Sequence, residues 1–195
     1  MNQSIYINAK GSLSALGKNA AEVLASYDQQ VNTLTLDEAT QLPVSRLNQA
    51  AEQQIQQLRQ EDPRYKKLDR SVLMAIYAAR QCVKSAGWQD GDYGINIGSS
   101  RGATGLFEKY HKDFLDHQKV HPLTSPTTTL GNIASWVGQD LYNKGISFSH
   151  SITCSTAFHA LLNGIAWLNA GMSNKFLIGG SEAALTPFTL EQMKS

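Results

Sequence analysis

The chain has 195 residues, of which 42% are hydrophobic and 17% charged, and its formal net charge is +1. These values are ordinary for one globular domain, and the small net charge argues against a nucleic-acid-binding surface. The longest apolar stretch, around Leu161, is interrupted by asparagines and glycines, so no segment is expected to insert into a membrane. Two cysteines without a spacing framework, and no charged region ahead of an apolar core at the start, predict a cytoplasmic location.

Short elements are predicted in the first third of the chain. Residues 4–9 have the pattern of a short strand, and residues 19–27 predict a helix capped by their first residue, an asparagine. The polar, turn-rich residues 33–43 predict a loop. Residues 45–61, rich in Gln and Ala, predict an exposed helix that ends before Pro63. Few apolar side chains would anchor that helix, so a partly mobile excursion is the alternative.

The next helix is the clearest amphipathic element. Apolar residues recur at helical spacing over residues 68–86, with Asp69 near the start and Gly87 just after the end. The residues of this face are Leu68, Val72, Ala75, Ile76, Ala79, Val83 and Ala86. Cys82 lies at the edge of the face, so we expect it to be structural.

Strands and helices alternate in the middle of the chain. The pattern predicts a buried strand, a helix with one apolar stripe, a loop, a second helix and a short strand. These elements cover residues 93–98, 102–116, 117–129, 130–142 and 146–149. The stripe of the first helix contains Leu106, Phe107, Tyr110 and Phe114.

The most informative segment is residues 147–156, Ser-Phe-Ser-His-Ser-Ile-Thr-Cys-Ser-Thr. It predicts a buried strand, a sharp turn and then a helix with Cys154 in its first turn. There the unpaired N–H groups and the positive end of the helix dipole favour the thiolate, which is the nucleophilic form of cysteine. The alternative is that Cys154 is a small, buried core residue.

The helix after Cys154 is apolar on almost every side over residues 157–168, which predicts a central, buried helix. Gly171 suits the position that ends such a helix. Residues 175–182 then predict a strand that leads into a glycine turn. Strand, helix and strand form a βαβ unit, so the sequence predicts a layered α/β domain.

Other candidate sites are weaker. The glycine-rich residues 98–105 lack the spacing of phosphate-binding motifs, so a tight structural turn is favoured over a nucleotide site. His159 falls on a different side of its helix from Cys154, whereas His150 precedes the nucleophile on a strand that can bring it close. The remaining histidines are His111, His117 and His121. No cysteine or carboxylate cluster supports a metal site among them, so they are expected to be solvated.

Several segments match one family of enzymes in order and spacing. Residues 152–157, Ile-Thr-Cys-Ser-Thr-Ala, are followed by residues 178–187, Ile-Gly-Gly-Ser-Glu-Ala-Ala-Leu-Thr-Pro. Further matches lie in residues 5–17, 68–87 and 93–100, and at Ser125, Pro126, Asn132, Lys144 and Gly145. Across nearly its whole length the chain resembles the β-ketoacyl-acyl-carrier-protein synthases, which are condensing enzymes of the thiolase fold.

The resemblance implies a thiolase-like layered α/β fold, with helices packed around a mixed β-sheet. These synthases are about twice as long and have two similar halves, so residues 1–195 correspond to an N-terminal synthase domain. In the family, two histidines and a lysine of the second half complete catalysis, and a glycine-rich loop there supplies an oxyanion-hole N–H. The chain stops at Ser195, so we expect it to hold the nucleophile without these groups and to be inactive alone.

The resemblance also implies an activity. Cys154 would form an acyl intermediate that is condensed with malonyl-acyl-carrier protein by decarboxylation, in fatty-acid or polyketide-type biosynthesis. The alternative is a non-catalytic partner like a chain-length factor, although retention of Cys154 argues against it; a degradative thiolase fits the motifs less well. No metal or soluble cofactor is implied, because the acyl carrier protein carries the phosphopantetheine. Ile146 and His150 depart from the family pattern, which often has proline and a small or apolar residue there.

Partners follow from the same resemblance. They are an acyl carrier protein and a ketosynthase-like chain, in a homodimer or a heterodimer. A basic cluster at a helix start is either a solvated face or a docking surface for the acidic carrier protein, and it consists of Arg64, Lys66, Lys67 and Arg70. Glu182 is expected to have a structural hydrogen-bonding role. Half of this fold would expose apolar surface, so the chain is expected to associate across residues 146–149 rather than remain a monomer.

Overall fold

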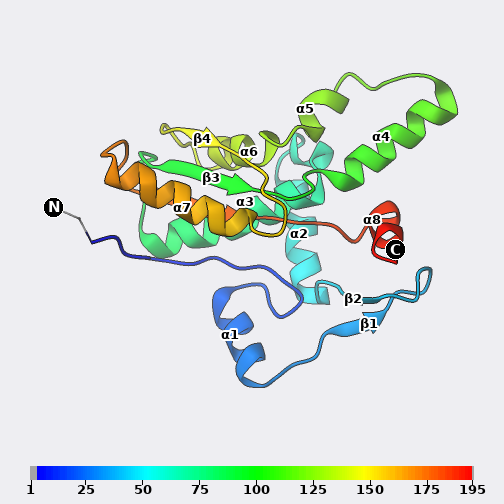
Figure 1. Ribbon diagram of the computed structural model, residues 1–195, viewed down its shortest axis with the longest axis horizontal. Coiled ribbons are helices and arrows are strands. Elements are labelled where there is room, and N and C mark those ends of the chain that lie inside the picture. The colour runs from blue at the N-terminus through cyan, green and yellow to red at the C-terminus, as the bar shows by residue number, and fades with distance from the viewer. Residues whose placement is uncertain (1–3, 195) are drawn as a thin grey trace.

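The computed structural model describes residues 4–194, which form helices around a small parallel sheet (Figure 1). The helices are α1 (Ala20–Asp28), α2 (Gln49–Glu61), α3 (Arg70–Ala86), α4 (Thr104–His117), α5 (Thr124–Thr128), α6 (Asn132–Asp140), α7 (Thr156–Asn169) and α8 (Pro187–Gln192), with a 3-10 turn η1 (Tyr65–Lys67). The strands are β1 (Leu34–Leu36), β2 (Pro43–Ser45), β3 (Gly94–Gly98), β4 (Ser147–Phe148) and β5 (Phe176–Gly180).

The parallel sheet has the strand order β4-β3-β5, and β3 is buried along its whole length. The antiparallel pair β1-β2 stands apart from it. Helix α7 packs on one face of the sheet, and α3 and α6 pack on the opposite face (Figure 1). The chain passes from β4 through α7 to β5, which confirms the predicted βαβ unit and the layered α/β class.

The core lies where α3, α6 and β3 meet. Helix α3 contributes the predicted apolar face, including the fully buried Val72 and Ile76. Its start is capped by the Asp69 side chain, which accepts a hydrogen bond from the Ser71 N–H at 2.8 Å. Its end is Gly87, whose φ of 69° is a left-handed conformation that glycine adopts without strain. The boundaries of this helix are therefore close to the predicted ones.

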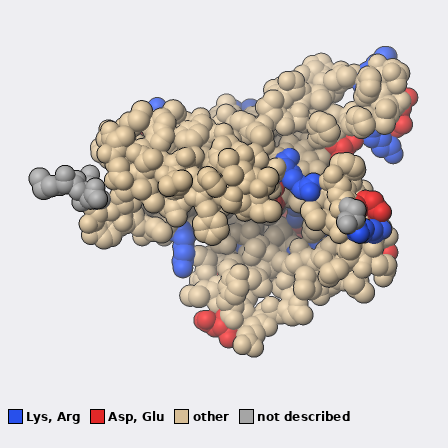
Figure 2. Space-filling view, in the orientation of Figure 1, with Lys and Arg blue, Asp and Glu red and all other residues tan. Residues whose placement is uncertain are grey.

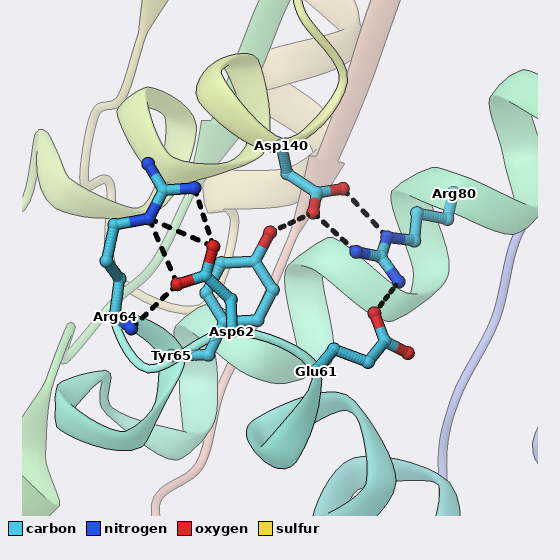
Figure 3. A network of polar contacts seen from close by, with 6 residues as sticks. All are labelled: Glu61, Asp62, Arg64, Tyr65, Arg80 and Asp140. Carbon is cyan, nitrogen blue, oxygen red and sulfur yellow. Dashed lines mark hydrogen bonds and ion pairs between the residues drawn. The ribbon is translucent and has the colours of Figure 1, made fainter.

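A polar network ties α2, η1, α3 and α6 together at the edge of this core (Figure 3). Arg80 of α3 donates to both oxygens of Asp140, at 2.9 and 2.7 Å, and to Glu61 at 2.6 Å. The Tyr65 hydroxyl donates to the same Asp140 carboxylate, which is 1% exposed. Burial is the larger cause, and this hydrogen bond the second, of a shift that raises the pKa of Tyr65 to about 12, so the phenol stays protonated.

The first third of the chain differs from its prediction. Residues 4–9 pair with no strand; with α3, α7 and β5 they line a cavity of about 730 Å³ that separates them from the sheet. The predicted loop over residues 33–43 contains β1 and leads into β2, because Thr and Leu side chains suit the pairing of Leu34 with Ser45. Helix α2 begins four residues later than predicted, at the Asn48 cap, and Ile55 and Leu58 bury its inner face.

The middle of the chain differs in its details. The apolar stripe of α4 does not enter the core, and Phe107 is 61% exposed. The predicted loop after α4 includes the short helix α5, and α6 is shorter at both ends than its prediction. Strand β4 pairs only two residues with β3 instead of four. Within residues 4–194, no helix is both long enough and apolar enough to cross a membrane.

Candidate functional site

Cys154 lies in the turn between β4 and α7, and the thiol is exposed. It stands just ahead of Ser155, the N-cap of α7, so the prediction that it lies in the first helical turn is wrong. The turn that precedes α7 contains Thr153, which adopts a left-handed backbone with φ of 48°. The thiol remains beside the amino end of α7.

Short hydrogen bonds hold the turn closed. The Thr156 hydroxyl donates to the Thr153 carbonyl at 2.6 Å and accepts from the Ile152 N–H at 2.9 Å. The Ser155 hydroxyl donates to the Ile152 carbonyl, also at 2.9 Å. These bonds offset the cost of a left-handed threonine and present Cys154 outward on a defined backbone.

Two histidines lie near Cys154 in the sequence, and neither is placed as its base by a hydrogen bond. His159 bonds through Nδ1 with the Ser155 carbonyl at 3.1 Å, within the first turn of its own helix. His150 follows β4 rather than lying on it, and its ring joins Asn96 of β3 to the Thr156 carbonyl. The prediction that His159 faces away from the thiol agrees with its contact, and His150 has a structural connection that the sequence did not indicate.

The prediction that α7 is buried on every side is wrong. Within α7, all of which the structure describes, the buried residues are Thr156, Ala160 and Gly164. On the outward side, Phe158 is 77% and Leu162 59% exposed. Figure 2 shows this part of the surface without charge colours, in keeping with a helix that has no charged residue. One face of α7 covers β3 and β5, and the other has no cover among residues 4–194.

The end of α7 matches its prediction. Gly171 has φ of 69°, and its N–H bonds with the Leu168 carbonyl at 3.1 Å. The Met172 N–H bonds with the Trp167 carbonyl, also at 3.1 Å. This pair of bonds is a Schellman motif, which lets the chain turn back into β5.

The glycine-rich residues 98–105 form a structural turn rather than an open anion site. The start of α4 already meets a carboxylate, because the Leu106 N–H donates to Asp69 Oδ2 at 3.1 Å. Glu182 accepts from the N–H and the hydroxyl of Ser100, the latter at 2.9 Å, which confirms the structural role expected of it. An anionic phosphate would meet two carboxylates here, so the geometry does not favour a nucleotide site.

The four residues of the basic cluster differ in their surroundings. Arg64 is paired with Asp62, and Arg70 is paired with Glu52 through both carboxylate oxygens. Their charges are therefore partly neutralised. Lys66 and Lys67 of η1 are exposed and make no ion pair within residues 4–194. They are the members of the cluster that remain available to an acidic partner.

The remaining candidates agree with their structural interpretation. Burial raises the pKa of the Cys82 thiol, which keeps it protonated and unreactive. His111 stacks on Phe107, and His121 on Tyr110, on the exposed side of α4. In the described part of the chain, no group of three histidines, cysteines or carboxylates is placed to hold a metal ion.

Comparison with known proteins places these features in a family. A family model described as the N-terminal domain of β-ketoacyl synthases matches residues 17–195. The 3-oxoacyl-acyl-carrier-protein synthase II of Arabidopsis thaliana, which is chloroplastic, is 25% identical over 134 residues, or 64% of this chain and 25% of its own length. Nodulation protein E of Rhizobium leguminosarum bv. trifolii is 25% identical over 200 aligned residues, covering 95% of this chain and 48% of the relative. The chain thus spans half or less of these relatives.

Solved structures share the fold. The ishigamide ketosynthase/chain length factor matches with a TM-score of 0.81 at 15% identity, over 96% of this chain and 49% of its own. A β-ketoacyl synthase from Burkholderia phymatum STM815 matches with a TM-score of 0.74 at 19% identity, over 96% and 48%. A type II polyketide ketosynthase solved in complex with its acyl-carrier protein has the same TM-score at 15% identity, over 96% and 47%. The predicted thiolase-like fold is thereby confirmed.

Proposed function

Since this chain belongs to the β-ketoacyl synthase family, through that family's N-terminal domain, we propose that Cys154 is the nucleophile of a condensing acyltransferase. The observation that carries the proposal is an exposed thiol on a constrained turn, at the amino end of the helix in the βαβ unit. A nucleophile needs both access to substrate and a fixed position, and Cys154 has both. We further propose that residues 1–195 act as one such domain.

The reaction proceeds in two steps. The Cys154 thiolate attacks the carbonyl of an acyl thioester, a new S–C bond forms, the bond from that carbonyl to the carrier sulfur breaks, and the carrier leaves as its thiolate. A malonyl thioester then loses carbon dioxide, and the electron pair left on its α-carbon attacks the acyl-Cys154 carbonyl. The Cys154 sulfur leaves as thiolate, and the product is a β-ketoacyl chain two carbons longer. The Cys154 backbone N–H is the oxyanion donor that this domain would supply.

Partners and cofactors are part of the proposal. The acyl groups arrive on an acyl carrier protein, whose own phosphopantetheine arm supplies the thiol, so this domain needs no metal or soluble cofactor. Its cytoplasmic location remains a prediction. A second ketosynthase-like unit, from the same or another chain, would cover the outer face of α7 and add the remaining catalytic groups.

A second candidate is a pocket-shaping partner of a separate synthase. It is supported by the match to a solved ketosynthase/chain length factor, which has the highest TM-score of the structures described above. Under this proposal Cys154 would not be acylated, and the chain would contribute surface to a partner's acyl pocket. The exposed thiol favours the first proposal over this one.

Intact-protein mass spectrometry distinguishes the two candidates. The natively expressed chain, with any polypeptide that copurifies with it, is incubated with acyl-loaded carrier protein. The expected result is one acyl mass on this chain, absent in Cys154→Ala and present in Cys82→Ala, since Cys82 is half-buried and protonated. An acyl mass on the copurified partner alone would reject the catalytic role and favour the pocket-shaping one.

Docking of the carrier protein is a separate prediction. We expect the double substitution Lys66→Glu and Lys67→Glu to weaken carrier-protein binding about tenfold, because both lysines are exposed and make no ion pair with the part of the chain that the structure describes. The measurement is a titration of carrier protein followed by fluorescence anisotropy. The control Lys112→Glu with Lys119→Glu makes the same change of charge on and after α4. Equal affinities for both variants and the unmodified chain would reject this docking surface.

A further inference from the structure

His150 connects the central strand of the sheet to the helix that follows Cys154. Its Nδ1 lies 2.9 Å from Oδ1 of Asn96 on β3, and its Nε2 lies 3.0 Å from the carbonyl oxygen of Thr156 in α7. Asn96 and Thr156 are buried, and the imidazole between them is half-buried. The ring therefore sets the spacing between β3 and the first turn of α7.

The hydrogens on this ring follow from its partners. The Thr156 carbonyl only accepts, so Nε2 carries a hydrogen and donates. Nδ1 then has two possibilities. In the first, the ring is an imidazolium, and Nδ1 donates to Asn96 Oδ1. In the second, the ring is neutral, and the Asn96 amide is flipped so that its N–H2 group donates to Nδ1. The buried Nδ2 of Asn96 has no other hydrogen-bond partner in the described chain. The bond to Thr156 is present in both cases.

Thr156 links the position of His150 to that of Cys154 through hydrogen bonds of its hydroxyl group. Its hydroxyl bridges Ile152 and Thr153, the two residues just before the nucleophile, at 2.9 and 2.6 Å. Gly98 of β3 packs closely against both residues and leaves no room for a side chain. A Cβ placed on Gly98 would lie 2.2 Å from Thr156 Cγ2 and 2.6 Å from the His150 carbonyl oxygen. A shift of Thr156 would therefore move the turn that carries the thiol.

We propose that His150 is a positioning residue for Cys154, and this inference rests on the proposed function of Cys154 as the acylated nucleophile. His150 touches neither the thiol nor an acyl group in the proposed reaction. It acts through Thr156, by holding the turn in the conformation that presents the sulfur. Misplacement of a reacting group by about 1 Å costs roughly 100-fold in rate, which is the effect that loss of this contact is expected to approach.

Three variants separate positioning from general stability. His150→Leu keeps bulk and removes both hydrogen bonds. His150→Gln places an amide N–H2 near the position of Nε2, so it can still donate to the Thr156 carbonyl. His150→Asn is shorter and reaches only toward Asn96. His117→Leu is the matched control, because that histidine is exposed at the end of α4 and, among the described residues, bonds only within its own helix.

The test is the rate of Cys154 acylation against acyl-carrier concentration, on the native assembly. We expect His150→Leu and His150→Asn to lower the maximal rate by roughly 10- to 100-fold with KM unchanged. His150→Gln is expected within about threefold of the unmodified chain, and His117→Leu equal to it. An unchanged rate in His150→Leu would overturn the proposal, as would a loss in His150→Gln as large as in His150→Leu.

Amide hydrogen exchange separates this inference from the function on which it rests. If the unmodified chain takes no acyl group, the proposed function fails, but the turn can still be examined. Exchange over residues 152–157 is expected to be roughly tenfold faster in His150→Leu and near normal in His150→Gln. Equal exchange in all variants would show that His150 does not hold the turn.

Discussion

Cys154 owes its exposure to the residues on either side of it. Thr153 turns the backbone into the left-handed region, and Thr156 closes the turn with its hydroxyl. The sequence points to Cys154 as the proposed nucleophile through its position between a strand and a helix. It does not indicate the support from His150, because Asn96 is 54 residues away and comes beside it only when β3 and β4 pair. A threonine two residues after the cysteine is the one local signal of the closed turn.

Glu52 offers a residue-scale prediction about pH. The hydrogen bonds from Arg70 lower the pKa of the Glu52 carboxyl from 4.5 to about 2. As the pH falls, the Glu52 carboxyl binds a proton in the unfolded chain at a higher pH than in the folded chain. The stabilisation by this pair is therefore complete above pH 4.5 and is lost as the pH falls through about 2. The pair is more than one-third exposed, so we expect Glu52→Gln to lose only about 0.5 kcal/mol at pH 7.

The measurement is urea unfolding at pH 7 and again at the lowest pH at which the native state persists. The difference between Glu52→Gln and the unmodified chain should shrink with falling pH. Glu38→Gln is the control, since that side chain is exposed and makes no ion pair in the described residues. A difference that stays constant with pH would contradict the assigned cause.

At the scale of elements, local signals placed the helices better than the strands. Helix α3 could be predicted closely because Asp69 and Gly87 mark its ends and its apolar face is continuous. Residues 4–9 satisfy the pattern of a strand and form none, since a strand also needs a partner with free N–H and carbonyl groups at the right distance. The β1-β2 hairpin was missed for the opposite reason, because its polar, turn-rich sequence hides two short pairing segments.

The Asp69 carboxylate caps two helices at once, so its substitution gives a testable prediction at the scale of elements. Its Oδ1 accepts from the Ser71 N–H and its Oδ2 from the Leu106 N–H, at the starts of α3 and α4. We expect Asp69→Ala to lower the free energy of unfolding by about 3 kcal/mol, more than a single cap contributes, since it leaves buried donors unpaired.

Asp69→Asn is the matched control in the same denaturation experiment. Its amide oxygen can still cap α3, but its N–H2 group cannot accept from Leu106, so about half of the loss is expected. If Asp69→Ala costs no more than an ordinary single cap, about 1 kcal/mol, the contact with α4 contributes nothing to stability.

At the scale of the whole molecule, one layer is open. Helix α7 covers the sheet with its small residues Ala160 and Gly164, while Phe158 and Leu162 point outward. Strand β4 is the edge of the sheet, and Ile146 beside it is 46% exposed. A helix that is apolar all round is normally buried, so the pattern in the sequence predicts a cover that the described residues 4–194 do not provide.

We therefore predict that the chain associates through this side of the molecule. Light scattering should give a mass at least twice the 21.3 kDa of one chain, or a complex with another polypeptide. Phe158→Glu with Leu162→Glu is expected to raise the fraction of single chains, because it places charge on the outer face of α7. Leu24→Glu with Tyr27→Glu is the control on the exposed side of α1. A cooperatively folding, unmodified monomer would reject the prediction.

The amino-acid sequence by itself determined the βαβ unit, the amphipathic helix α3, the choice of Cys154 as the proposed nucleophile and the family resemblance, because each depends on neighbouring residues or on the order of motifs. Only the tertiary structure decided which face of α7 is covered, which basic residues stay unpaired, and which side chains hold the turn that carries Cys154. Those outcomes depend on contacts such as those of Glu52 with Arg70 and His150 with Asn96. Such pairs meet only after helices and strands pack, so no local pattern contains them.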